Sequence, residues 1–117
     1  MNILEELISI LSTLNIPIET GVFKDETPDE YIVLVPLLDT YPISADDFPL
    51  EDVQEVRISL FTKGNYIQRK NLISAICMSH YFFITGRTYN GYDTETSYHQ
   101  YTIDVAKNYG IENEEEN

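Results

Sequence analysis

Three residues of this sequence have side chains that often serve as nucleophiles, bases or metal ligands, but their positions favour structural roles. Cys77 is the only cysteine, so a single chain cannot form a disulfide or a multi-cysteine zinc site. It is expected on the buried face of a helix, where a thiolate is disfavoured. His80 falls at the end of that helix, and His99 shares a strand face with Tyr101, positions at which a histidine caps or packs. We predict a catalytic or metal-binding role for none of the three.

Carboxylates are abundant and gather in the region 39–55. Six of them are candidate functional residues: Asp39, Asp46, Asp47, Glu51, Asp52 and Glu55. Together they could attract a divalent cation, but their spacing matches no calcium loop and lacks the glycine of its sharp turn. Asp93 and Glu95 fall on an exposed turn without an apolar pocket that would raise the pKa of either. We therefore predict no metal site, no cofactor and no enzymatic activity.

The net charge of −13, from 20 acidic and 7 basic residues, limits the possible partners. Proteins that bind the outside of a nucleic acid neutralise phosphates with a lysine and arginine surface, which this composition does not provide. A protein past which DNA must move without adhering would carry this sign, although the charge also serves solubility. No apolar run approaches the roughly 20 residues of a membrane span. We expect a cytoplasmic protein with no membrane partner.

The elements that position these residues follow from the apolar periodicity. Capped amphipathic helices are predicted over 2–14 and 65–80, and strands over 18–23, 31–38, 55–61, 81–89 and 97–106. The acidic region 39–55 is interpreted as a protruding loop. The length fits a single domain over 1–111, followed by a disordered acidic tail over 112–117. The predicted fold class is α+β, an antiparallel sheet with two helices on one face, in the order α-β-β-β-α-β-β.

The sheet carries more apolar surface than two helices on one face can cover. Phe61 alternates onto the face opposite Val56 and Ile58, and the strand 31–38 is apolar on both of its faces. Such surplus apolar surface is typical of a contact between subunits. The candidate interface residues are Arg57, Ser59, Phe61, Tyr31 and Val33. Four tyrosines around the last hairpin are equally consistent with an interface and with cross-strand packing.

Three stretches of the chain carry a resemblance to a known family. They are LEELISILSTLNIPIETGVFKDETPDEYIVLVPL near the start, VQEVRISLFTKGNYIQRKNLISAI in the middle and GRTYNGYDTETSYHQYTIDV near the end. Over residues 2–107 the sequence resembles the small tail-completion or tail-terminator proteins of tailed bacteriophages and prophages, which join head to tail. The layout of helix, strand, turn and second helix carries the likeness.

The resemblance implies a structural role without a cofactor. The α+β protomer would form a ring, commonly a hexamer, that ends the tail tube and contacts the neck or head-completion protein. DNA would pass through the ring without adhering, and the protein would be assembled in the bacterial cytoplasm and reside at the head–tail junction of the virion. In that setting the five candidate interface residues would join the subunits, and the acidic region 39–55 would line the lumen or dock on the neck.

A second hypothesis is a DNA-mimic inhibitor, whose carboxylates imitate a phosphate ladder and occupy a DNA-binding enzyme. The small size and the acidity suit it. Mimics, however, spread regularly spaced acids along helices or strands, whereas here the acids collect in one region and in the tail. A monomeric regulatory domain is a third possibility.

Overall fold

The computed structural model describes residues 2–19, 27–40 and 51–110. Its elements are α1 (Ile3–Leu11), the 3₁₀-helix η1 (Ser12–Leu14), β1 (Ile18–Glu19), β2 (Glu30–Thr40), β3 (Glu51–Thr62), α2 (Tyr66–Ser79), β4 (Phe83–Tyr92) and β5 (His99–Gly110). The α+β class with two α-helices and five strands is confirmed. The predicted first helix is shorter, because its last turn tightens into η1 and ends at Asn15, which has a left-handed backbone with φ 61°.

The five strands form one sheet in the order β1-β2-β3-β5-β4. Three pairings are antiparallel, but β1 pairs parallel to β2, with Ile18 opposite Ile32. The prediction of a wholly antiparallel sheet is therefore wrong at this edge. The reason is local. β1 is two residues long, and the short segment after η1 brings the chain into the sheet running in the same direction as β2.

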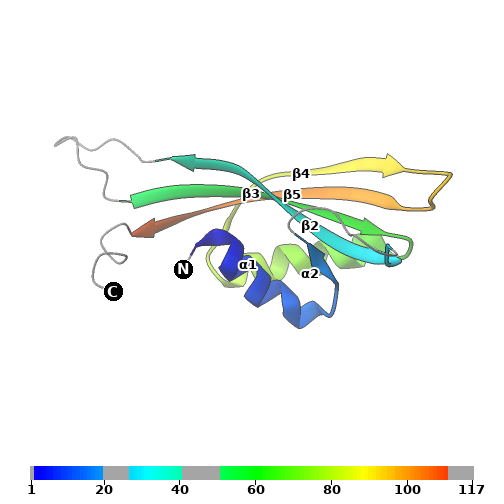
Figure 1. Ribbon diagram of the computed structural model, residues 1–117, viewed down its shortest axis with the longest axis horizontal. Helices are drawn as coiled ribbons and strands as arrows, with labels where there is room; N and C mark the ends of the chain where they lie inside the picture. Colours follow the sequence, from blue (N-terminus) through cyan, green and yellow to red (C-terminus); the bar gives the residue numbers. More distant parts are fainter. Residues whose placement is uncertain (1, 20–26, 41–50, 111–117) are drawn as a thin grey trace.

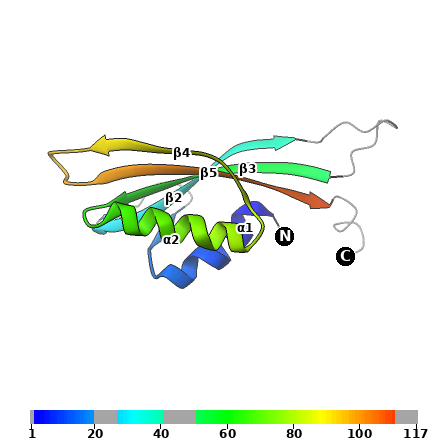
Figure 2. The ribbon, with the colours of Figure 1, turned by 180° about the vertical axis from the view of Figure 1, so that it is seen from behind.

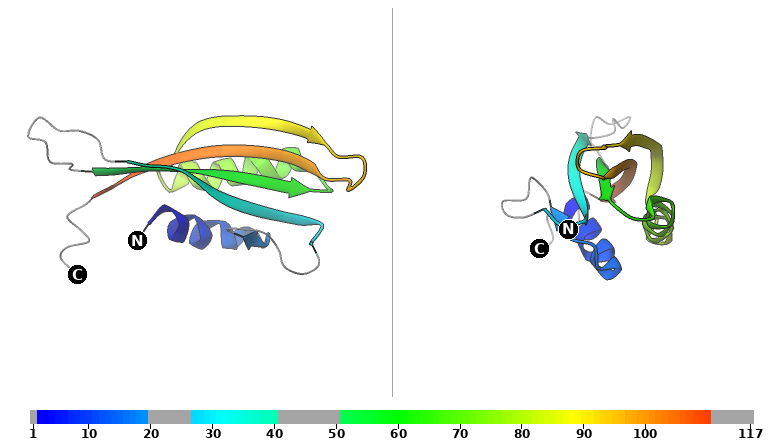
Figure 3. Two further views of the ribbon diagram at one scale, coloured as in Figure 1. Left: turned by 45° about the horizontal axis from the view of Figure 1, so that its top comes forward. Right: turned by 90° about the vertical axis from the view of Figure 1, so that its right-hand side faces the viewer.

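Both helices cover the same face of the sheet, as predicted (Figures 1 and 2). Figure 3 shows the strands twisting past the helices, with the opposite face turned away from them. Asn2 begins α1 with the predicted reciprocal cap, accepting from the Glu5 N–H at 2.9 Å while its own N–H donates to the Glu5 carboxylate at 3.0 Å. Asn65 caps α2 through the Gln68 N–H at 3.1 Å. The core between sheet and helices consists of Ile3, Leu7, Ile10, Leu11, Ile16, Ile32, Leu34, Val56, Ile58, Leu60, Ile73, Cys77, Phe82, Tyr101, Ile103 and Val105.

The predicted loop over 39–55 is wrong at both of its ends. β2 continues to Thr40 and β3 begins at Glu51, so four of the candidate acids lie on strands: Asp39, Glu51, Asp52 and Glu55. A register shift after Pro36 lets β2 go on pairing with β3, and β5 extends far enough to pair with Glu51. Backbone pairing, with β5 along the whole of β3 and with β2 from Val53 onward, outweighs the weak strand preference of acidic residues. Asp46 and Asp47 lie outside the described residues, as does the tail 112–117.

A half-buried polar cluster ties α1 and α2 to the end of β5. The Glu6 carboxylate accepts from Lys107 Nζ at 2.7 Å and from the Tyr109 hydroxyl at 2.7 Å. Lys107 also donates to the carbonyl of His80, the C-cap of α2, at 2.9 Å. Burial by itself raises the pKa of Glu6, but the hydrogen bonds from Lys107 and Tyr109 outweigh it, and the pKa lies below its ordinary value. Burial and the neighbouring Glu6 raise the pKa of Tyr109.

This cluster predicts a pH-dependent effect of Glu6→Gln. At about pH 7 the variant should lose about 1–3 kcal/mol of unfolding free energy, because one amide oxygen cannot replace a carboxylate between two donors. The folded pKa of Glu6 is depressed, so its contribution is complete above the ordinary value of 4.5 and is lost as the pH falls through the folded value. Urea unfolding of variant and wild type should therefore converge in acid. A difference that stays constant with pH would show that Glu6 acts through packing alone.

Candidate functional site

The face of the sheet opposite α1 and α2, here called the helix-free face, brings the predicted interface residues together. Directly paired residues share a face, and the register places Tyr31 opposite Phe61, Val33 opposite Ser59, and Val35 opposite Arg57. All five candidate interface residues thus lie side by side on β2 and β3. Within the described part of the chain, no helix packs on this face. The alternation in the sequence predicted this grouping, and their role in subunit contact stays a prediction.

An apolar half of this face, here called the β2 patch, consists of Tyr31, Val33, Val35, Phe61 and Tyr98. The Tyr31 and Phe61 rings stack at 4.7 Å between centroids, and Tyr98 meets both edge-on at 5.5 and 6.3 Å. The Tyr98 hydroxyl donates to the carbonyl of Pro28. Burial, with a contribution from Tyr98, raises the pKa of Tyr31. Phe61 is therefore half-buried by neighbouring rings within its own chain, while Val35 is 43% exposed.

A groove of about 740 Å³ runs from the aromatic part of the β2 patch to the β4–β5 hairpin. Its lining combines phenol rings, one lysine and two carboxylates: Thr27, Tyr31, Phe61, Lys63, Asn90, Gly91, Tyr92, Asp93, Glu95, Thr96, Tyr98 and Gln100. The Asp93 carboxylate accepts from the backbone N–H of Glu95 at 2.9 Å, which lowers the pKa of Asp93. This carboxylate therefore closes the turn.

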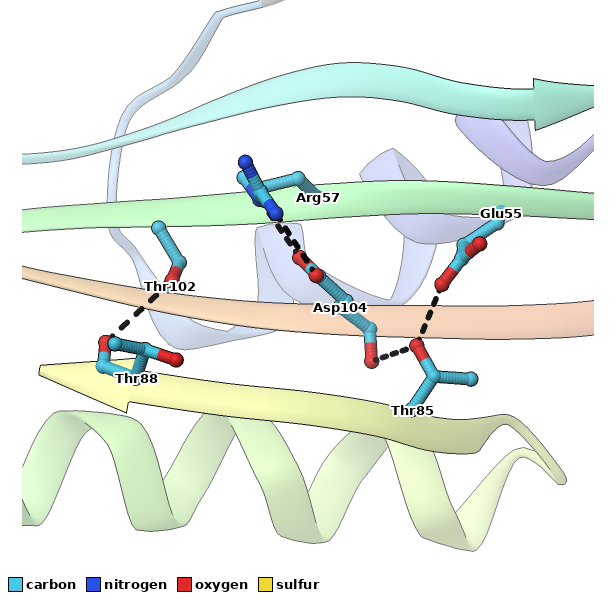
Figure 4. Close-up of polar contacts among 6 residues, drawn as sticks. All are labelled: Glu55, Arg57, Thr85, Thr88, Thr102 and Asp104. Carbon is cyan, nitrogen blue, oxygen red and sulfur yellow. Dashed lines mark hydrogen bonds and ion pairs between the residues drawn. The ribbon is translucent and has the colours of Figure 1, made fainter.

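The polar half of the helix-free face is satisfied by its own contacts (Figure 4). Arg57 and Asp104 form a two-point ion pair, with Nε–Oδ1 at 2.9 Å and the second nitrogen–oxygen contact at 3.1 Å. The Thr85 hydroxyl donates to the Glu55 carboxylate at 2.6 Å and contacts the Asp104 carbonyl at 3.2 Å. These contacts join β3, β5 and β4: Arg57 and Asp104 neutralise each other, and the Glu55 carboxylate accepts from a hydroxyl.

The residues with reactive side chains lie on the helix side and are engaged in packing. Burial raises the pKa of the Cys77 thiol to about 12, which keeps it protonated. The His99 ring lies against Tyr66 and Tyr92, with Nδ1 at 3.0 Å from the Tyr89 hydroxyl. Among residues 2–19, 27–40 and 51–110, no group of three or more His, Cys, Asp or Glu side chains could hold a metal ion.

Two residues of this face were not among the predicted interface residues: Tyr98, one of the four hairpin tyrosines left open between an interface and cross-strand packing, and Asp104. Tyr98 reaches the β2 patch because Ser97, with φ 67°, turns the chain just before β5, and no local pattern signals that. Asp104 pairs with Arg57 only through the β3–β5 register.

No family model matches the sequence, and no curated protein matches it. Neither helix in the described part of the chain has the length and hydropathy of a membrane span.

One pair of identical substitutions tests whether the helix-free face is uncovered in the free protein. Val35→Thr keeps the size and the branching of an exposed side chain, and should change the unfolding free energy by less than about 0.5 kcal/mol. The same change at Val56, which is fully buried on the helix side of β3, places a hydroxyl in the core and should cost about 1–3 kcal/mol. Urea unfolding measures both. Equal losses would mean that Val35 is covered in the monomer.

Proposed function

We propose that this chain is a structural protein of the head–tail junction of a tailed phage or prophage. Copies of it would form a ring that ends the tail tube and contacts the neck or head-completion protein. The observation that carries the proposal is the helix-free face, where the β2 patch leaves apolar and aromatic side chains without a helix over them in the described chain. The sequence resemblance to tail-terminator proteins agrees with such an assembly.

The energetics of the β2 patch favour a contact between subunits. Each large apolar side chain that becomes fully buried contributes roughly 1.5–3 kcal/mol. The β2 patch, with the neighbouring Leu37 at 41% exposure, offers several such groups on one surface. Association itself costs several kcal/mol in lost freedom, so the contact could be weak in solution and strengthened by the tail tube as a template. A head-to-tail contact that closes on itself gives a ring.

The distribution of charge supports passage of DNA without binding. The acid-rich ends of β2 and β3 extend beyond the helices (Figure 1). Meanwhile four basic side chains are paired with carboxylates of the same chain: Arg57 with Asp104, Lys63 with Asp29, Arg69 with Glu30 and Lys107 with Glu6. A surface in which the cations are neutralised and acids are in excess repels phosphate. An acidic lumen would therefore let DNA move through.

Phe61→Asp tests the ring. Wild type, mixed with tubes of the tail tube protein encoded nearest to it, should cap the tubes, and sedimentation should show a ring that grows with protein concentration. The variant should stay monomeric and leave tubes uncapped, because a charge at the centre of the contact would be buried without a partner. Its far-ultraviolet circular dichroism should not change. Ile8→Asp, which places the same charge on an exposed position of α1, should behave as wild type.

Three outcomes would count against this proposal. If wild type never caps tubes, the proposed function is wrong. If the Phe61→Asp variant is unfolded, Phe61 belongs to the core. Tight, stoichiometric inhibition of a DNA-binding enzyme by the wild type would favour the DNA-mimic hypothesis instead.

A further inference from the structure

A second apolar surface lies at the opposite edge of the sheet, where α2 leads into β4. The three most exposed large hydrophobic side chains of the described residues are found here: Tyr81 is 82% exposed, Phe83 70% and Met78 57%. β4 is an edge strand, paired with β5 alone in the described sheet. We call this outer edge of the sheet the β4 patch: Met78, Ile84 and Arg87 lie on its helix side, Phe83 lies on the helix-free side of β4, and Tyr81 lies in the turn before β4.

Tyr81 occupies a backbone position that suits glycine. Its φ is 68°, its N–H donates to the Met78 carbonyl at 3.1 Å, and the Phe82 N–H donates to the Cys77 carbonyl at 3.0 Å. This is the Schellman ending of a helix, in which the left-handed residue is usually glycine because a Cβ is strained there. Since the Tyr81 ring is mostly exposed, packing within the described chain does little to offset the strain.

Arg87 differs from the other arginines in having no internal counterion. Among the described residues it forms no ion pair or hydrogen bond, whereas Arg57 and Arg69 are each paired with a carboxylate. It lines a shallow hollow with Met78, Ile84, Thr85 and Gly86. An unpaired cation among exposed apolar groups fits a partner that is both apolar and acidic.

We propose that the β4 patch receives the β2 patch of a second copy of this chain. The Glu95 carboxylate lines the groove that adjoins the β2 patch, and Asp29, paired with Lys63 at 3.3 Å, keeps 86% of its side chain exposed beside it. The β2 patch with its border thus offers the acidic and apolar surface that Arg87 and its neighbours fit. β2 and β4 lie towards opposite edges of the sheet. A ring of more than two copies needs two different surfaces on each copy. The inference rests on the proposed ring and assigns the two surfaces that meet at each contact between its subunits.

Complementation between two variants tests the pairing. Phe61→Asp disables the β2 patch and Phe83→Asp the β4 patch, and each variant alone should be monomeric. Their equimolar mixture retains one intact pair of surfaces and should give a heterodimer and nothing larger in sedimentation velocity. A mixture that stays monomeric, or a Phe83→Asp variant that assembles as wild type does, overturns the pairing.

Tyr81→Gly separates assembly from folding. Glycine relieves the strained φ, so the melting temperature should stay the same or rise, while loss of the ring should weaken self-association about tenfold or more. Asn15→Gly is the matched control, because Asn15 has a similar φ of 61° but lies far along the chain, at the end of η1. It should leave self-association unchanged. Self-association of Tyr81→Gly at wild-type strength would contradict the inference.

The inference and the proposed function fail in different ways. If wild type and the Phe83→Asp variant cap tail tubes equally well, the pairing of patches is overturned and the function stands. Wild type that assembles through the two patches yet never caps a tube sustains the pairing and removes the function.

Discussion

The structure depends on the pairing of β3 on both of its sides. All twelve of its residues pair with β5 on one side, and the residues from Val53 to Thr62 pair also with β2 on the other. Alternation along β3 then sends Val56, Ile58 and Leu60 into the fully buried core and Arg57 and Phe61 to the helix-free face. A slip of one residue in either pairing would exchange the two sets. The same register therefore fixes the core that folds the chain and the surface proposed to assemble it.

Features encoded by neighbouring residues could be predicted from the sequence, and those encoded by distant pairing could not. The Asn2 and Asn65 caps, the alternation on β3 and the burial of Cys77 depend on local spacing, and the structure has them as expected. The direction of β1, the strand ends at Thr40 and Glu51 and the Arg57–Asp104 pair depend on which strand lies next to which. The acidic residues around 51–55 were interpreted as part of a loop because acidic residues have a weak strand preference. Sequence composition contains no information about the two strands that pair with β3.

The ion pairs within the protomer stabilise the folded chain. They also leave few cations free to bind carboxylates of a neighbouring copy. Pairing with Asp104, Asp29, Glu30 and Glu6 neutralises most of the described cations within the protomer, and the surface that remains is strongly acidic. Two such surfaces repel each other over a Debye length of about 8 Å at physiological ionic strength. In the proposed assembly, contact between copies would therefore come mainly from apolar packing, with Arg87 as a cation still available to a partner.

The edges of the sheet indicate what kind of packing this can be. Ile32 donates its N–H to Pro17 on the β1 side, so by alternation the nitrogen of Pro36 also faces that edge, where a proline offers no donor to an added strand. At the other edge β4 has register shifts between Ile84 and Gly86 and between Tyr89 and Gly91. Such bulges twist an edge away from regular pairing. With both edges unsuited to strand addition, the proposed association is left to side chains, and the β2 and β4 patches are the surfaces proposed for it.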